Sequence, residues 1–349
     1  MEYLIGWGVV YYLLIISSAV DHKSRLPACL ALVYFLFLAV MRGSVGTDTE
    51  NYESIVGLFQ QGFQFSGMEP GFVGVSWILF QITDSPFLVM RIISFLVVAM
   101  ALLFIWKSDD NERFAMLSYF IPAFIYSYSM NAVRIGFASM AILLAFQMVR
   151  AQSKSRFAYL FSAVMFHYSS LFSIVYIWLT STDLINKRSL TFALFATMLV
   201  PVLLYINIDY FNVKLLSYQG AESPNILSGL SKVVVCLVFL GGLFFSGLQW
   251  GDKSKSCFMG LGGIVLFWLL SSVSYAGLRF LDLMSFALPV SILILHGKSK
   301  QAFNLPLKMS FVCAGLLSAF SLYRNFTFEY GQGGAPFMPY YIADFFRIL

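Results

Sequence analysis

The chain contains about ten continuous apolar runs, each long enough, or nearly so, to cross a lipid bilayer as a helix. The runs occupy residues 3–20, 26–42, 87–106, 114–128, 131–149, 189–206, 229–248, 257–274, 278–296 and 307–323. Because they are unbroken rather than alternating with polar residues, they predict helices and not half-buried strands. We therefore expect an all-α, polytopic transmembrane helical bundle of about 10–12 spans, built as a single integral membrane domain over residues 1–349.

The composition narrows the class of protein further. Only 11% of the residues are charged, whereas a soluble globular chain carries about 25%, so a soluble enzyme is excluded. The net charge of +5 is spread over short loops without a basic stripe, and we expect no nucleic-acid partner. The four cysteines lie in or beside apolar runs and the three histidines are isolated. We therefore expect no metal and no cofactor.

The short loops predict how the chain crosses the membrane, because Lys and Arg favour the cytoplasmic side. Basic or mixed loops lie at 22–25, 107–113, 150–156, 187–188, 253–255 and 298–300. Placing them all in the cytoplasm leaves both termini outside. The same topology places outside the loops at 43–68 and 207–228 and the tail at 324–349.

Three further segments carry expectations of their own. The apolar stretches 70–82 and 157–180 do not fit simple crossings, so we expect re-entrant or short helices there. Irregular backbone at membrane depth persists only where it is buried in protein or lines a cavity, so both breaks indicate a cavity. In the first outer loop, we expect residues 49–63 to form an amphipathic helix capped by Thr47 or Asp48.

Five arginines lie at or inside the outer ends of apolar spans, against the usual charge bias: Arg42, Arg91, Arg134, Arg279 and Arg324. Inserting an Arg at the centre of the bilayer costs roughly 2.5–3.5 kcal/mol of free energy on insertion scales. Five such arginines on one side of the membrane therefore indicate a shared role. Guanidinium groups bind phosphate oxygens in bidentate fashion. We interpret the group as an outward-facing pocket for a membrane-borne phosphate or diphosphate. The alternatives are snorkelling to the headgroups and local pairing, such as Arg279 with Asp282.

A sugar carried on a lipid diphosphate would also need a general base for the attacking hydroxyl. His167, within the broken stretch, and Asp48, on the outer loop, are the two candidates. Each has a plainer interpretation, since His167 can be a buried hydrogen-bonded residue and Asp48 can pair with Arg42. The tail from Tyr323 onward is rich in aromatic residues, which suit an interfacial belt, a lid or the stacking of sugar faces.

Four motifs in order resemble a known family. The first, an Arg-Gly…Gly-Thr-Asp…Tyr pattern, is similar to the signature of EpsG/Wzy-type bacterial polysaccharide (O-antigen) polymerases and reads Met41-Arg42-Gly43-Ser44-Val45-Gly46-Thr47-Asp48-Thr49-Glu50-Asn51-Tyr52. The others are Glu69-Pro70-Gly71-Phe72, Asn131-Ala132-Val133-Arg134 and Phe166-His167-Tyr168-Ser169-Ser170. The resemblance runs from about residue 26 to 180, with Arg279 as the best later anchor. Two positions depart from the family pattern, which often has Gln at Ile135 and usually has Ala at Ser170.

The resemblance implies a bacterial inner-membrane glycosyltransferase of the C-type membrane fold, with its active site facing the periplasm. Such enzymes build O-antigen, the polysaccharide of lipopolysaccharide, or related surface glycans, from repeat units carried on undecaprenyl diphosphate. The growing glycan leaves its carrier and joins the next lipid-linked unit, and the family is thought to need no metal. The implied partners are the lipid-linked donor and acceptor, membrane lipids and a chain-length regulator.

Residue roles follow from this resemblance together with the arginine pattern. The diphosphates are assigned to Arg42, Arg134 and Arg279, and then to Arg91 and Arg324. The base is His167 or Asp48, and the sugar contacts are Tyr52, Glu69 and Tyr323. The nearest alternative is an O-antigen ligase or another polyprenyl-linked glycosyltransferase. A transporter of lipid-linked glycans is a weaker alternative, because such folds often carry internal repeats and none is detectable here.

Overall fold

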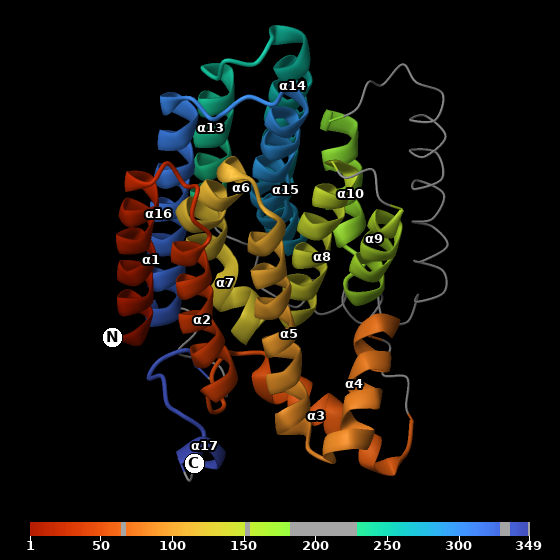
Figure 1. Cartoon of the computed structure of the whole chain (residues 1–349). Coiled ribbons are helices and arrows are strands. Elements are labelled where there is room, and N and C mark those ends of the chain that lie inside the picture. The colour runs from red at the N-terminus through yellow and green to blue at the C-terminus, as the bar shows by residue number, and fades with distance from the viewer. Residues whose placement is uncertain (64–67, 151–153, 182–228, 329–335, 348–349) are drawn as a thin grey trace. The chain divides into compact units, whose positions relative to one another are not determined.

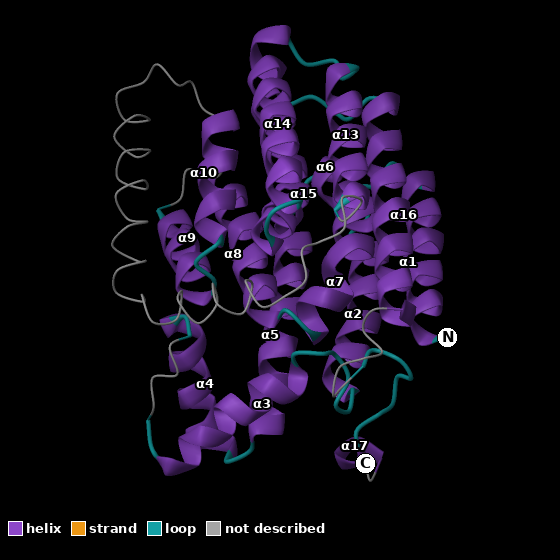
Figure 2. Ribbon diagram, turned by 180° about the vertical axis from the view of Figure 1, so that it is seen from behind, coloured by secondary structure: helices purple, strands orange, loops and turns teal. Residues whose placement is uncertain are grey.

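A computed structural model describes residues 1–63, 68–150, 154–181, 229–328 and 336–347. These residues form helices joined by turns (Figures 1 and 2), and no β-strand occurs among them. They divide into two compact units, Met1–Tyr168 with Gly315–Leu349, and Ser169–Ala314. The predicted polytopic helical bundle is confirmed.

Within the described ranges, five helices are long and apolar enough to span a membrane. They are α1 (Glu2–Ala19), α5 (Pro86–Lys107), α14 (Trp250–Ser271), α15 (Tyr275–Ser299) and α16 (Leu305–Phe328). Shorter apolar helices are α2 (Leu26–Met41), α4 (Pro70–Thr83), α8 (Val133–Arg150), α9 (Ser155–Phe166), α10 (Ser170–Ser181) and α13 (Leu230–Phe244). A continuous helical path runs through α6 (Asp110–Ala115), a π-helical turn and α7 (Ile121–Met130). The expected span 189–206 and loop 207–228 lie outside the described residues.

The three special segments form short helices. Residues 70–82 become α4, and 157–180 becomes α9 and α10 with a break at His167. The outer-loop helix α3 (Thr49–Gly57) continues into a 3₁₀ turn and is shorter than predicted. Asp48 occupies its N-cap position, but its side chain makes no capping hydrogen bond. The other predicted cap, Thr47, donates its hydroxyl to Asn131 Oδ1 at 3.3 Å instead.

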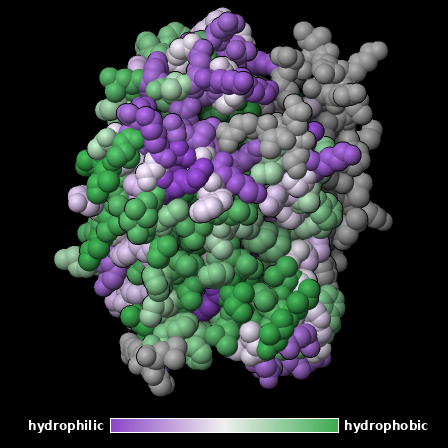
Figure 3. All heavy atoms as spheres, viewed as in Figure 1, coloured by the Kyte–Doolittle hydropathy of each residue, from purple (hydrophilic) through white to green (hydrophobic). Residues whose placement is uncertain are grey.

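The outer faces of unit 1 are suited to lipid. On α1 and α2, large apolar side chains such as Tyr12, Ile15 and Phe37 are exposed. Figure 3 shows the front of α1, α2 and α5 as mostly hydrophobic, with hydrophilic side chains over the connections α1–α2 and α5–α6. An apolar exterior on helices of this length is the arrangement that a bilayer requires.

Two close helix contacts fix the part of unit 1 that carries the polar residues of the motifs. A Cβ on Gly71 would lie 2.8 Å from the Met165 carbonyl oxygen, so α4 approaches α9 closely. A Cβ on Gly136 would lie 2.2 Å from the Tyr128 carbonyl oxygen, so α8 folds tightly against α7. Phe166 stacks on Phe137 with 3.7 Å between ring centroids, joining α9 to α8.

Unit 2 consists of α10, α13, α14, α15 and the first half of α16. Phe172 of α10 packs edge-on against Phe267 of α14, 5.4 Å between centroids. Lys232 pairs with Asp282 at 2.6 Å, joining α13 to α15. Asp282 thus has a partner on the neighbouring helix, and its local pairing with Arg279 stays a prediction.

Candidate functional site

Three helix ends of unit 1 bring a carboxylate, a guanidinium and an imidazole together. Glu69 is the N-cap residue of α4, whose first residue Pro70 has the fixed φ that suits a helix start. Arg134 lies in the first turn of α8, and His167 is the C-cap residue of α9. Each side chain is thus placed by a helix end and not by a mobile loop.

Glu69 joins the other two side chains through its separate carboxylate oxygens. Its Oε2 forms an ion pair with Arg134 Nη1. Its Oε1 accepts a hydrogen bond from His167 Nδ1 at 3.0 Å. The Glu69 side chain is only 2% exposed, whereas those of Arg134 and His167 are 14% and 19% exposed. The carboxylate therefore lies beneath the two groups that it holds.

Glu69 is ionised at any physiological pH. Burial raises its pKa, but the hydrogen bond from His167 and the charges of Arg134 and His167 outweigh burial and bring it to about 2. An ionised carboxylate on Nδ1 fixes the imidazole with its proton on that nitrogen, which leaves Nε2 as the basic atom. Glu69, which the sequence suggested as a sugar contact, is placed to orient His167.

Aromatic rings surround Arg134. Its Nε donates to the Tyr52 hydroxyl at 3.2 Å, and its guanidinium carbon lies 5.3 Å from the Tyr52 ring centre and 5.9 Å from that of Phe72. Burial raises the pKa of Tyr52; the Arg134 charge lowers it and the Asp48 charge raises it. Tyr52 therefore remains a neutral phenol that holds one edge of the Arg134 fork.

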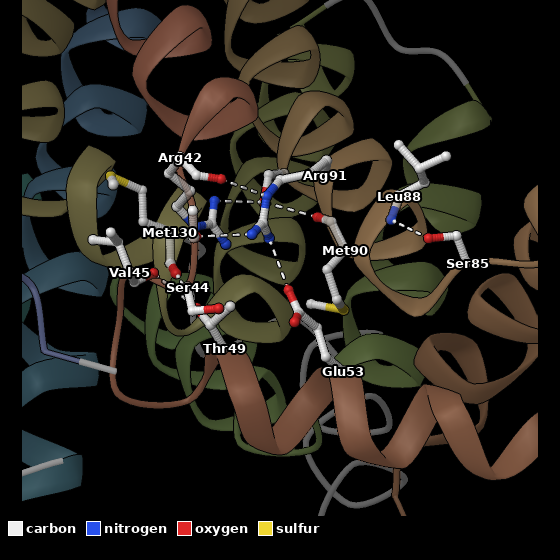
Figure 4. A network of polar contacts seen from close by, with 12 residues as sticks. Arg42, Ser44, Val45, Thr49, Glu53, Ser85, Leu88, Met90, Arg91 and Met130 are labelled. Atoms are coloured by element: carbon white, nitrogen blue, oxygen red, sulfur yellow. Dashed lines mark hydrogen bonds and ion pairs between the residues drawn. The ribbon is translucent and has the colours of Figure 1, made fainter. Parts of the chain in front are cut away.

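Arg42 and Arg91 are engaged with protein groups (Figure 4). Arg42 is 1% exposed, and its Nη1 donates to the carbonyls of Ala39 and Ser129, at 2.6 and 3.0 Å, and to Ser94 Oγ at 3.0 Å. Arg91 is 2% exposed and contacts Glu53 Oε1 with Nη1 at 3.2 Å. The predicted pairing with Asp48 is not among the contacts of Arg42, whose Nη1 donates to two backbone carbonyls and a serine.

Arg91 also holds the loop that follows α2. Its Nε donates to the carbonyl of Arg42 at 3.0 Å and its Nη2 to that of Gly43 at 2.8 Å. Burial raises the pKa of Glu53, although the Arg91 and Arg42 charges lower it. This geometry fits a pair of arginines that fix backbone better than a pair aimed at a ligand.

Asn131 links the first and third motifs. Its Oδ1 accepts from the backbone N–H of Asp48 at 2.7 Å and from Thr47. Gly46 has φ +103° in this turn, and a Cβ there would lie 2.6 Å from the Met130 carbonyl oxygen. Asn131, three residues before Arg134, therefore holds the turn at residues 46–48 in place. In this position the half-buried Asp48 lies close enough for its charge to raise the pKa of Tyr52.

Three predicted residues remain: Arg279, Arg324 and Tyr323. Arg279 is exposed in the second turn of α15, in unit 2. Arg324 is exposed on α16. Tyr323 of α16 packs edge-on against Trp7 of α1, with 6.2 Å between ring centroids, so its ring contacts the helix bundle.

The cluster supplies acid–base and anion-binding groups but no metal cage. Over the described ranges, no three His, Cys, Asp or Glu side chains form a group that could hold a metal ion. Sequence reasoning found Arg134, His167 and Tyr52, but it missed that Glu69 joins them and that Asn131 pins the turn. Both residues stand inside the motifs, and the only available signal was their polar character within apolar surroundings.

Comparison with known proteins adds a family. The family model described as EpsG family matches residues 25–341. No curated protein and no solved structure matches the chain. The match covers all the motifs quoted above.

Proposed function

The chain belongs to the EpsG family, and on this premise we propose that it is a glycosyltransferase that polymerises a bacterial surface polysaccharide, such as O-antigen. Its substrates are oligosaccharide repeat units linked to undecaprenyl diphosphate at the periplasmic face of the inner membrane. The growing glycan is transferred from its lipid carrier to the next lipid-linked unit. The spanning-length helices and the apolar exterior of unit 1 support a multi-pass membrane location.

The observation that carries the proposal is the joining of Arg134 and His167 by Glu69. Transfer of a glycan from a diphosphate needs a positive group for the departing diphosphate and a base for the attacking hydroxyl. The cluster holds both side by side.

The proposed step balances as a simple displacement. The acceptor hydroxyl oxygen bonds to the anomeric carbon of the donor, and its proton passes to His167 Nε2. The bond from that carbon to the diphosphate oxygen breaks, and the electron pair leaves with the polyprenyl diphosphate. Glu69 stabilises the imidazolium that forms, as a buried carboxylate does for a catalytic histidine. Asp48 is the second candidate base.

Donor and acceptor each carry a diphosphate, so one arginine does not serve both. Within unit 1, we assign the departing diphosphate to Arg134 and the acceptor's to Arg324, and Arg279 stays a candidate from the sequence alone. Arg42 and Arg91 act without touching the substrate. Arg42 binds the Ser129 carbonyl of α7, and Arg91 binds the Gly43 carbonyl in the turn that leads towards α3. A chain-length regulator is the expected protein partner.

The test is deletion of the gene, complementation with variants, and separation of the surface polysaccharide on a gel. We expect deletion to abolish the ladder and leave a band of one repeat unit. Glu69→Gln and Arg134→Ala should fail to restore the ladder, whereas Glu50→Gln, on the exposed side of α3, should restore it. Polymer left on its lipid carrier and absent from lipid A would indicate a ligase. Single units trapped at the cytoplasmic face would indicate a transporter.

A further inference from the structure

The C-terminal segment forms a strap across the end of α2. Residues 340–343, here named the C-terminal strap, run antiparallel to residues 41–43, with Arg42 opposite Ile342. The Gly43 N–H donates to the Tyr341 carbonyl and the Ala343 N–H donates to the Met41 carbonyl, both at 2.9 Å. The turn out of α2 is thus paired along one backbone edge.

Two tyrosine hydroxyls extend the same attachment. Tyr340 donates to the carbonyl of Leu38 at 3.0 Å, and Tyr341 donates to that of Ser44 at 3.2 Å. The Tyr341 ring lies over Gly43, and a Cβ at Gly43 would be 2.0 Å from a ring carbon. The glycine of the Arg-Gly motif therefore makes room for a side chain from the far end of the chain.

The opposite edge of the same turn is held by Arg91. Its guanidinium binds the carbonyls of Arg42 and Gly43 and also faces Glu53 of α3. Glu53 is next in sequence to Tyr52, whose hydroxyl accepts from Arg134. A continuous set of contacts in unit 1 therefore leads from the strap to the candidate site.

We propose that the C-terminal strap is a positioning element for the candidate site, and that the contact of the Tyr341 ring with Gly43 contributes most to its effect. The strap touches no reacting atom. It fixes the turn at 42–44, so that Arg91 and α3 present Tyr52 to Arg134. Its effect on polymer rests on the proposed function, and its effect on the turn does not.

The first test is a double-mutant cycle between Gly43 and Tyr341. Gly43→Ala displaces the ring and Tyr341→Ala removes it, so each should lower polymer output roughly tenfold, because the packing of the ring on the turn is lost. Because both substitutions break the same contact, the double variant should make as much polymer as the less active of the two single variants. Tyr341→Phe keeps the ring and should retain most activity. Tyr12→Ala, a lipid-facing tyrosine of α1, is the matched control.

Membrane levels of each variant are matched by immunoblot, so lost protein is not counted as lost activity. Multiplicative losses in the double variant would overturn the proposal. So would Tyr341→Phe falling as low as Tyr341→Ala, because the ring contact would then not contribute most to the effect.

The second test reads the turn itself, independently of polymer. Ser44→Cys is labelled with a maleimide in detergent, and labelling of the four native cysteines is subtracted with the parent protein. Adding Tyr341→Ala should raise the labelling rate of position 44 several-fold, whereas adding Tyr12→Ala should not. An unchanged rate overturns the strap whatever the polymer shows. A raised rate with normal polymer from Glu69→Gln and Arg134→Ala refutes the polymerase and leaves the strap's hold on the turn supported.

Discussion

The Glu69 carboxylate accepts a hydrogen bond from His167 Nδ1 at 3.0 Å, across 98 positions of sequence. The same carboxylate pairs with Arg134, so it connects the two groups that glycosyl transfer requires. It does so from a position that is 2% exposed, which shields both interactions from solvent. The predictions below separate this orienting carboxylate from the groups that it serves.

Replacing Glu69 with Gln should keep the shape of the site and remove its charge. The amide cannot stabilise an imidazolium as a carboxylate does, so we expect polymer output to fall by about 10–100-fold, as for other orienting partners. Gel analysis of the polysaccharide at matched protein level measures this. Glu50→Gln on the exposed face of α3 is the control. Full activity in Glu69→Gln would show that His167 needs no charged partner.

Acidification should abolish the proposed glycosyl transfer through an imidazole and not through Glu69. The pKa of Glu69 is depressed from 4.5 to about 2, so its stabilising effect is complete above pH 4.5 and is lost only as the pH falls towards 2. Histidine is the side chain that ordinarily titrates between pH 5 and 8. We expect a fall in the initial rate between pH 7.5 and 5.5, measured on lipid-linked repeat units in detergent. The residual rate of His167→Gln should not show this fall between pH 7.5 and 5.5. The same fall in that variant would show that His167 is not the base.

Arg134→Lys should be nearly as damaging as Arg134→Ala. Lysine keeps the charge, but one ammonium group cannot bond Glu69 and Tyr52 in the geometry of a planar fork. Loss of one charged hydrogen bond is worth about 1.5–3 kcal/mol, or roughly 10–150-fold in rate. Arg25→Ala, at the start of α2 and exposed, serves as the control. Near-normal polymer from Arg134→Lys would indicate that only the charge matters.

Arg91→Met should lower the stability of the folded protein and should not act directly on the transfer reaction. It removes both donors to the turn and leaves the Glu53 carboxylate without its partner, and breaking such a buried pair costs about 3–5 kcal/mol. Thermal unfolding in detergent should show a clear drop in midpoint, with part of it recovered in Arg91→Met/Glu53→Leu. An unfolding midpoint equal to that of the parent, combined with lost polymer, would instead support the role in diphosphate binding that the sequence suggested for Arg91.

Two glycines of α4 provide a matched pair. Gly71→Ala places a methyl group 2.8 Å from the Met165 carbonyl oxygen, which is backbone and cannot swing aside, so α4 must move away from α9 and carry Glu69 from His167. Gly74→Ala meets nothing within 4 Å. We expect Gly71→Ala to lose most polymer and Gly74→Ala to keep it, by the same gel analysis. Equal behaviour of the two variants would mean that the α4–α9 approach does not set the site.

The sequence predicts the helices well, because apolar runs such as 87–106 and 278–296 are long and uniform. The break at His167 and the short helix after Pro70 also follow from polar and proline interruptions. What the sequence could not supply is pairing across the fold. Arg42, Arg91 and Arg134 look alike as outward arginines. Only the structure shows that Arg42 and Arg91 bind backbone carbonyls, whereas Arg134 pairs with Glu69 and donates to Tyr52.

The strap also has a consequence for biosynthesis. Tyr341 and Ser44 are 297 positions apart, so the turn after α2 leaves the ribosome long before the residues that pin it. Chains fold progressively as they are made, so the five spanning-length helices of the described residues all emerge while this corner still lacks its final partner. On the strap proposal, a chain cut before Tyr341 would keep these helices and lose the positioning of the turn, so membrane insertion and activity would be separable.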